Sequence, residues 1–322
     1  MPDDEKLVEH FEQFEHGWER PVRFLGALAA NDPRASQAKA ALLGVPYDGA
    51  VTYRGGARLG PRELRVASDS IETYCPKLDR DLDDHRYVDL GDLDCTPPEP
   101  ELGEEGEPID GMTPGERLVR NLRRQLDVLP DLPLLAVGGD HLVAFPFLER
   151  MVERHVDLQI LHIDAHMDLR EHWEGEPFNH STVLGRVLDR MRPSQGLHQW
   201  GIRSGLRSEW QQARGDARVH AIAPELAPAL ERIDQLVDRG APIYVTFDVD
   251  GLDPADIPGT GTPEPDGLRF GWVEAVLGRL ARAPRGLIGA DLVELAPALD
   301  PSGRSPVAAA RLCRTLLLAL LR

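Results

Sequence analysis

Polar side chains alternate along the stretch HIDAHMD, residues 162–168. Asp164, His166 and Asp168 directly follow the apolar run LQILHI. Side chains at positions i, i+2 and i+4 share one face only where the backbone is extended, and on a helix His166 would point away from both carboxylates. The branched apolar run is typical of a buried parallel strand. We therefore expect the three side chains at the carboxyl end of that strand, where open parallel sheets bind their ligands.

Three more polar groups follow apolar runs in the same way. His141 ends the motif GGDH after LLAV, Asp248 and Asp250 follow IYVTF, and Glu294 follows LIGADLV. Taken singly, each group has a structural interpretation: the histidine as a turn or cap residue, the aspartates as caps or turn formers, and the glutamate as half of an ion pair. A calcium-binding EF-hand is excluded, because Leu252 stands where that loop needs an oxygen ligand.

Considered together, these groups predict a metal site. Unpaired carboxylates packed at neighbouring strand ends would repel one another, and a bound cation removes that conflict. Two imidazoles and four carboxylates without cysteine suit a hard ion such as manganese better than a structural zinc. Two ions about 3.5–4 Å apart can share such a set and lower the pKa of a bound water, which gives hydroxide at neutral pH. The candidate ligands are His141, Asp164, His166, Asp168, Asp248 and Asp250.

The elements that must position these residues are also readable in the chain. Short apolar runs recur near residues 41, 87, 134, 158, 199, 218, 243 and 287. Helical patterns lie between them, for example after residues 115, 224 and 271. Strands and helices that alternate at this spacing predict a parallel sheet covered on both faces. We therefore expect a three-layer α/β fold with about eight mostly parallel strands, and a final helix in LCRTLLLALLR that packs in the core or at a subunit contact.

The composition of the chain indicates which classes of binding partner to expect. The formal net charge of −18 argues against general binding to nucleic acid or to an anionic membrane, and it permits a cationic substrate. No apolar run is long enough to span a bilayer, and no secretory segment opens the chain. Cys75, Cys95 and Cys313 show no paired spacing, so we expect free thiols in a reducing compartment. These features predict a cytoplasmic protein without a nucleic-acid or membrane partner.

Several motifs together resemble one protein family. GGDH is followed by DAHMD at 164–168 and by TFDVDGLDPADIPGTGTPEPDGL at 246–268, and GVPYDGAVTYRGGARLGPRELR begins at residue 44. The combination resembles the ureohydrolases, which include arginases, agmatinases and their relatives, over most of the chain. The resemblance implies an eight-stranded α/β fold and a dinuclear manganese centre on the six ligands named above. It also implies hydrolysis of a guanidino compound to urea and an amine.

The resemblance also implies roles for individual side chains. Glu294 would hold the guanidinium through charge-assisted hydrogen bonds. Asp168 would bridge the metals and accept the proton of the attacking hydroxide. His180, in EPFNHSTVL, would contact the substrate and carry a proton to the leaving amine. The structural alternative for His180 is a helix N-terminal residue without a catalytic role.

The segment after the metal triplet, residues 169–179, departs from arginases. It reads LREHWEGEPFN instead of their longer stretch rich in Asn, Thr and Ser, so L-arginine is not the expected substrate. Trp173, with Glu171, Glu174 and Glu176, could contact a hydrophobic and cationic tail, or the segment could be a solvated lip. We expect agmatine or a related alkylguanidine. Ser181, where many relatives have glycine, leaves the choice among such substrates open.

Other functions remain open at this stage. The DLR at 168–170 is similar to formiminoglutamate hydrolases, although those enzymes generally lack a histidine at the position of His180. Guanidinobutyrate, guanidinopropionate and guanidine hydrolases share the chemistry, and some relatives prefer nickel. A non-enzymatic alternative is a metal-binding regulatory homologue, which would usually have lost ligands, and none is missing.

Domain organisation and assembly are predicted as follows. Residues 1–37 form an amino-terminal arm that could contact another subunit, and residues 38–322 form a single α/β domain. The acidic segment at 95–116 is a solvated loop. On the resemblance alone we expect a homo-oligomer, a trimer or a hexamer.

Overall fold

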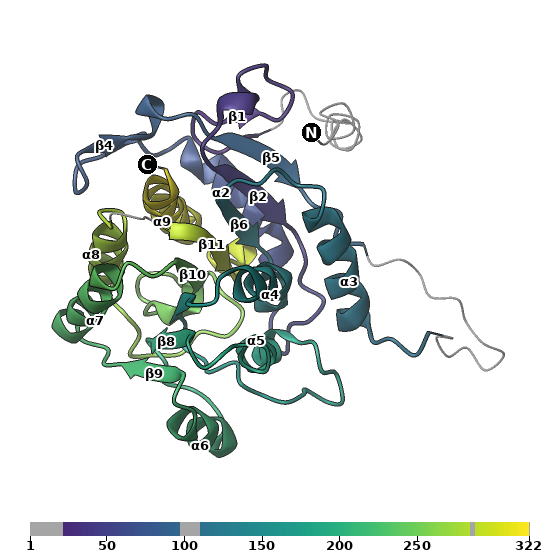
Figure 1. The fold of residues 1–322 in the computed structure, drawn as a ribbon. Helices are drawn as coiled ribbons and strands as arrows, with labels where there is room; N and C mark the ends of the chain where they lie inside the picture. The colour runs from purple at the N-terminus through teal and green to yellow at the C-terminus, as the bar shows by residue number, and fades with distance from the viewer. Residues whose placement is uncertain (1–21, 97–109, 284–286, 322) are drawn as a thin grey trace.

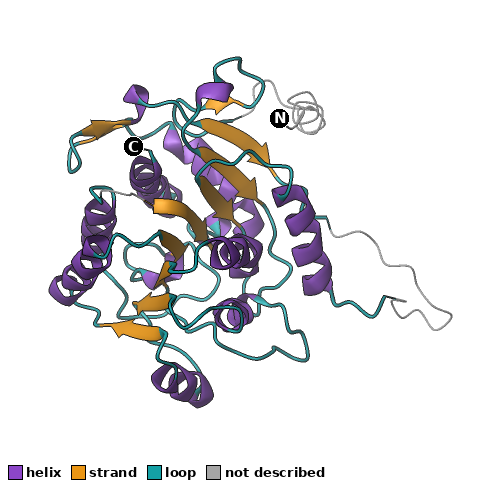
Figure 2. Ribbon diagram, viewed as in Figure 1, coloured by secondary structure: helices purple, strands orange, loops and turns teal. Residues whose placement is uncertain are grey.

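The computed structural model describes residues 22–96, 110–283 and 287–321. A twisted nine-stranded sheet runs through the centre of the molecule, and helices lie on both of its faces (Figures 1 and 2). The strand order is β1-β5-β2-β6-β11-β10-β7-β8-β9, and every neighbouring pair is parallel. The strands are β1 (Leu28–Ala29), β2 (Ala41–Val45), β5 (Val88–Asp92), β6 (Leu134–Gly138), β7 (Gln159–Ile163), β8 (Gly196–Trp200), β9 (Val219–Ile222), β10 (Ile243–Asp248) and β11 (Leu287–Val293).

All eight predicted strands are present, and the three-layer α/β prediction is confirmed. The ninth strand, β1, was not predicted, because two residues at a sheet edge carry no periodicity. It lies within the predicted arm and pairs with β5, so this part of the arm extends the sheet. The antiparallel pair of β3 (Tyr74–Cys75) and β4 (Arg80–Asp81) is a second addition.

The two helical layers bury two separate cores against the sheet. Alternate strand side chains, such as Leu42 and Val137, pack with one set of helices, while Leu43 and Ala136 pack with the other. The first layer contains α2 (Gly60–Ser68), α7 (Leu226–Asp238), α8 (Phe270–Leu280) and α9 (Arg304–Leu320). The second contains α3 (Pro114–Leu126), α4 (Phe145–Arg154), α5 (Val183–Leu188) and α6 (Arg207–Gly215).

The register of the sheet brings the predicted functional segments together. β6, β11, β10 and β7 are neighbours, and Phe247 pairs with both Ile163 and Leu292. Leu292 in turn pairs with Val137. The polar segments that follow these four strands therefore begin at the same level of the same sheet edge.

Other sequence predictions concern the ends and loops. The final helix α9 is buried along most of its length, which confirms the core-packed interpretation. Residues 1–21 of the arm and residues 97–109 of the acidic loop lie outside the described residues, and the domain boundary at residue 37 stays a prediction. Among the helices in the described ranges, none has the length and apolar character that a bilayer crossing needs.

A buried ion pair joins helix α2 of the first helical layer to strand β5, the neighbour of the edge strand β1. The Arg65 guanidinium, on α2, donates from Nε and Nη2 to the two carboxylate oxygens of Asp89, on β5, at 2.8 and 2.9 Å. Asp89 also accepts from the backbone nitrogens of Phe24 and Gly91. Both charged side chains are at most 6% exposed. Because water does not reach them, each charge is stabilised by the other.

Replacement of Arg65 tests this connection. Arg65→Met leaves Asp89 buried without its cation, and we expect the free energy of unfolding to fall by about 3–5 kcal/mol in chemical denaturation. The control is Arg34→Met, which removes an exposed ion pair with Asp32 and should leave stability near that of the wild type. A loss for Arg65→Met no larger than for the control would contradict the prediction.

Candidate metal centre and active site

The six predicted ligands converge at the carboxyl ends of β6, β7 and β10. His141 Nδ1 lies 3.0 Å from Asp168 Oδ2, 3.1 Å from Asp164 Oδ2 and 3.6 Å from Asp248 Oδ2. The second group forms around the other histidine. His166 Nδ1 lies 3.1 Å from Asp250 Oδ2 and 3.5 Å from Asp164 Oδ1. Asp164 thus belongs to two clusters of potential ligand atoms.

The backbone explains how one segment supplies three of these side chains. After β7 ends at Ile163, extended pairing continues at His166, which forms a parallel bridge with Ser204. The chain bends at Ala165 between these points, so the three polar residues follow the end of β7 without the continuous extended backbone that the alternation predicted. Asp168 then adopts a left-handed backbone with φ of 53°, and Glu294 does the same with φ of 63°. Such strain costs about 1–3 kcal/mol at a non-glycine residue and is concentrated at functional sites.

The environment of His141 fits a metal ligand. The Thr246 hydroxyl donates to Asp291 Oδ1 at 2.8 Å, so its oxygen accepts from His141 Nε2 at 3.0 Å. In a neutral ring Nδ1 would therefore carry the lone pair, and this buried atom has no hydrogen-bond partner although carboxylates surround it. An imidazole held by its other nitrogen and directed at carboxylate oxygens is the arrangement of a metal-binding histidine.

One further side chain and one backbone nitrogen hold Asp291 in place behind the cluster. Tyr244, on β10, donates to Asp291 Oδ2 at 3.0 Å, and the backbone nitrogen of Phe247 lies 3.3 Å from Oδ1. Asp291 is fully buried on β11. This network was not predicted, although Tyr244 and Thr246 alternate with Asp248 along one strand and a lone carboxylate interrupts the apolar run of β11.

His162 was also missed, and it acts on a candidate ligand. Its Nδ1 accepts from Gln199 Nε2 at 3.2 Å, so Nε2 carries the proton and donates to Asp164 Oδ2 at 2.8 Å. His162 is fully buried and two residues before Asp164 on the same strand face. Its geometry indicates a residue that orients Asp164 rather than an additional ligand. The alternation of polar residues at positions 162 and 164 was the sequence pattern that could have identified His162.

Four buried carboxylates lie close together in the cluster. Burial raises the pKa of Asp248 well above its usual range, and the neighbouring carboxylates of Asp250 and Asp164 raise it further. Burial and Asp164 likewise raise the pKa of Asp250, against the lowering effect of His166. A divalent cation would relieve this repulsion and hold the carboxylates ionised. Donor types, convergence and charge therefore all fit a metal centre.

Beside the cluster, His180 lies between Glu294 and Thr52. Glu294 Oε1 accepts from the backbone nitrogen of His141 and contacts His180 Nδ1, both at 2.9 Å. The other ring nitrogen, Nε2, lies 2.9 Å from Thr52 Oγ1. Burial alone lowers the pKa of His180, but Glu294 more than compensates and the pKa rises to about 9. The ring is therefore an imidazolium at neutral pH.

The two interpretations of His180 each describe part of the structure. The residue begins a short 3₁₀ helix, His180–Thr182, which leads into α5, and Asn179 caps this turn. It is therefore a helix N-terminal residue, as the structural alternative held. Its ring nevertheless contacts Glu294, which comes from β11 more than a hundred residues away. The position at the helix start therefore does not prevent this contact, and the catalytic role stays a prediction.

A cavity of about 260 Å³ opens over the cluster. Three of the candidate ligands, His166, Asp168 and Asp248, line it together with His180. Glu294 is 1% exposed and lies behind His180, outside the lining. The remaining lining residues are Thr52, Met167, Arg170, Trp173, Ser181, Ser204, Gly205, Leu206, Glu209 and Thr262. The volume suits a small organic molecule.

The outer wall of the cavity differs from the acidic lip that the sequence suggested. Glu171 and Glu174 are exposed and do not line the cavity. Glu176 accepts instead from the Thr113 hydroxyl at the start of α3, at 2.7 Å. The lining contains Trp173 and Arg170, whose guanidinium stacks over the indole ring at 4.7 Å.

Arg170 has one nearby counter-charge. Its Nε lies 3.9 Å from Glu209 Oε2, and Glu209 is almost fully buried while accepting from the backbone nitrogens of Leu169 and Leu206. Neither Arg170 nor Glu209 was predicted as a residue of the site. Nothing near Glu209 in the sequence marks it, because it lies in the first turn of α6, about forty residues after the segment that it contacts at Leu169.

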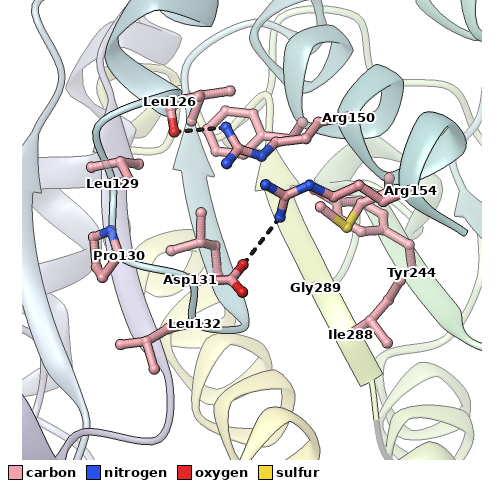
Figure 3. A pocket seen from close by; sticks show the side chains of 13 residues that line it. Leu126, Leu129, Pro130, Asp131, Leu132, Arg150, Arg154, Tyr244, Ile288 and Gly289 are labelled. Atoms are coloured by element: carbon pink, nitrogen blue, oxygen red, sulfur yellow. Dashed lines mark hydrogen bonds and ion pairs between the residues drawn. The ribbon is translucent and has the colours of Figure 1, made fainter. Parts of the chain in front are cut away.

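A second cavity lies at the opposite, amino end of the strands. It is lined by Leu134, Tyr244 and Ile288, and by Arg150 and Arg154 on α4 (Figure 3). Both arginines are already bonded, Arg150 to the Leu126 carbonyl and Arg154 to Asp131. The space measures about 30 Å³, which suits a water molecule rather than a substrate.

Comparisons with known proteins agree with this geometry. The model of the arginase family matches residues 38–319. An agmatinase of Bacillus cereus is 38% identical over 286 residues, which cover 89% of this chain and 93% of the relative. A guanidinopropionase of Pseudomonas aeruginosa is 35% identical over 309 residues, with 92% and 91% covered.

Solved structures give the same result. The proclavaminate amidino hydrolase of Streptomyces clavuligerus has a TM-score of 0.76 at 28% identity, with 94% of this chain and 97% of that chain covered. The agmatine ureohydrolase of Thermoplasma volcanium has a TM-score of 0.72 at 27% identity, with 88% and 90% covered.

The contact between Glu294 and His180 predicts a titration. In metal-free protein, NMR should show the His180 imidazole titrating near pH 9 rather than near its ordinary value of 6.5. Glu294→Gln removes the charge that stabilises the imidazolium, so the pKa of His180 should fall. An unchanged titration in the variant, or one at the ordinary value in the wild type, would show that this contact does not determine the charge of the ring.

Proposed function

The chain belongs to the arginase family, and we propose that it hydrolyses a guanidino compound, agmatine or a related alkylguanidine, to urea and an amine. The observation that carries the proposal is the position of the two ligand clusters, which share Asp164 and contribute His166, Asp168 and Asp248 to a cavity that His180 also lines, with Glu294 in contact with His180. Agmatinases among the relatives support the alkylguanidine.

We assign the metal to the six clustered side chains. His141, Asp164, Asp168 and Asp248 would hold one ion, and Asp164, His166 and Asp250 contribute to the second. The oxygen-rich donor set favours manganese, with nickel as the alternative. When bound, two such ions lower the pKa of water and so supply a nucleophile at neutral pH.

The other residues bind the substrate and move protons. Glu294 Oε1 is occupied by His180 and the His141 backbone, which leaves Oε2 for the guanidinium. Asp168, at the cavity wall, is the proposed proton acceptor. His180 is charged at neutral pH and can therefore protonate the leaving amine, a step that needs an acid of this kind.

Urea release tests the proposal. Manganese-loaded protein should release urea from agmatine, and a chelator should abolish this activity until manganese is returned. Asp168→Asn and Asp250→Asn should lower kcat by about 100-fold or more while circular dichroism shows a retained fold. Guanidinobutyrate, guanidinopropionate, guanidine and L-arginine complete the substrate panel, with formamide release from formiminoglutamate in parallel. Silence across the panel with both manganese and nickel would contradict the proposal.

A second candidate is hydrolysis of a guanidino acid. Arg170 is a cation in the outer cavity wall, where it would attract a carboxylate tail and oppose an ammonium tail. Relatives named guanidinobutyrase and guanidinopropionase are 32% and 35% identical to the chain. Glu209 offsets part of this charge, so both tails stay possible substrates.

Arg170→Met distinguishes the two tails. Loss of the cation should raise kcat/KM for agmatine and lower it for guanidinobutyrate, each by about fivefold or less, as expected for a partly exposed charge. The ratio of the two kcat/KM values is the measurement, because it cancels any general loss of active protein. Equal changes for both substrates would show that the tail does not reach Arg170.

We further propose a homo-oligomer, a trimer or a hexamer, in the cytoplasm. The support for the oligomer is the resemblance to the family, and the support for the compartment is the absence of paired cysteine spacing. Light scattering at micromolar concentration would measure the assembly, and a monomeric mass would contradict it.

A further inference from the structure

We propose that Thr52 is a further catalytic residue, whose hydroxyl passes a proton from His180 to the leaving amine. The inference rests on the proposed guanidino hydrolysis. In this step the Thr52 Oγ–H bond breaks as an N–H bond forms on the amine. The Nε2–H bond of His180 breaks at the same time and restores the hydroxyl, so His180 ends neutral and Thr52 is unchanged.

The first observation in support is that both nitrogens of the His180 ring already have hydrogen-bonding partners. Nδ1 lies 2.9 Å from Glu294 Oε1, and Nε2 lies 2.9 Å from Thr52 Oγ1. No ring N–H remains to reach a substrate directly. His180 and Thr52 both line the cavity, so a proton that leaves Nε2 meets the threonine oxygen first. A hydroxyl can accept that proton and donate its own in the same hydrogen-bonded line.

The second support is the anchoring of the Thr52 loop, residues 46–56, between β2 and α2. On one side, the Ala50 nitrogen donates to Asp140 Oδ2 at 2.8 Å, and its carbonyl accepts from Asn179 at 2.6 Å. On the other side, Arg54 donates to the Thr260 carbonyl at 2.9 Å. These anchors lie two residues before and two residues after Thr52. They connect the loop to the GGDH segment, to the residue before His180 and to the chain after β10.

Anchoring of this kind suits a group that transfers protons. A reacting hydroxyl must be held within a few tenths of an ångström of its partners, and a loop bonded on both sides provides this before substrate binds. Orientation of His180 alone would not need Thr52, since Glu294 already fixes Nδ1 and Asn179 caps the turn that His180 begins. The hydroxyl therefore has a function on the cavity side of the ring.

The experiment compares Thr52→Val with Thr52→Ser in manganese-loaded protein, with whichever panel substrate the wild type cleaves. Valine keeps the shape and removes the proton path, so kcat should fall by about 100-fold, the lower range for general acid catalysis, while KM stays within about twofold. Serine restores the hydroxyl and should keep kcat within about threefold of the wild type. Tyr53→Phe removes an exposed hydroxyl one residue away and should leave both constants unchanged.

A change of leaving group separates proton transfer from a structural effect. An aryl guanidine releases a weakly basic aromatic amine, which needs protonation less than an alkylamine does. Thr52→Val should therefore lose much less activity on the aryl guanidine than on the alkylguanidine. Equal losses on both substrates, a kcat for Thr52→Val within threefold of the wild type, or a serine variant as impaired as the valine variant would overturn the inference. Failure of the wild type to release urea at all would instead refute the proposed function.

Discussion

Mutual repulsion among four carboxylates at one sheet edge is the constraint on which the site depends. Asp164, Asp168, Asp248 and Asp250 are buried or nearly so, and water cannot screen their charges. Two imidazoles lie among them, yet the pKa values of Asp248 and Asp250 remain raised. The fold therefore concentrates a negative potential that a cation relieves, and the strained backbone at Asp168 is consistent with a geometry held for that purpose.

The sheet resists this repulsion from within. Parallel strands fix the level at which each carboxylate leaves the core, and hydrogen bonds inside the sheet fix two of the site's side chains. His162 orients Asp164, while Tyr244 and Thr246 hold Asp291 behind His141. These groups are polar residues in otherwise apolar strands, where an unpaired donor or acceptor would be costly. Each is paired, so the interior remains stable while it supports a charged edge.

Sequence reasoning succeeded where local geometry determines position. The position of Asp164, His166 and Asp168 directly after an apolar run was enough to place them at one strand end, and eight apolar runs were enough to predict the main sheet. His162 and Thr246 obey the same alternation and could have been found. Thr52 and Glu209 could not, because their positions depend on contacts with residues far away in the chain, such as Asn179 for the loop of Thr52 and Leu169 for Glu209 on α6. The two-residue strand β1 carried no pattern at all.

In the proposed function, the residues at the strand ends carry out the reaction, and the residues of the other segments determine the choice of substrate. The candidate ligands that line the cavity follow strand ends, which leave these side chains little freedom of position. Other parts of the lining come from the segment after Asp168 and the segment around Glu209. A relative named agmatinase and one named guanidinopropionase are 38% and 35% identical to this chain, so overall identity does not decide between a cationic and an anionic tail. The net charge of −18 attracts a cation from a distance, but screening limits that effect to about 8–10 Å. Within the cavity Arg170 and Glu209 lie 3.9 Å apart, so under the proposed function their local charges, rather than the net charge, would distinguish the two tails.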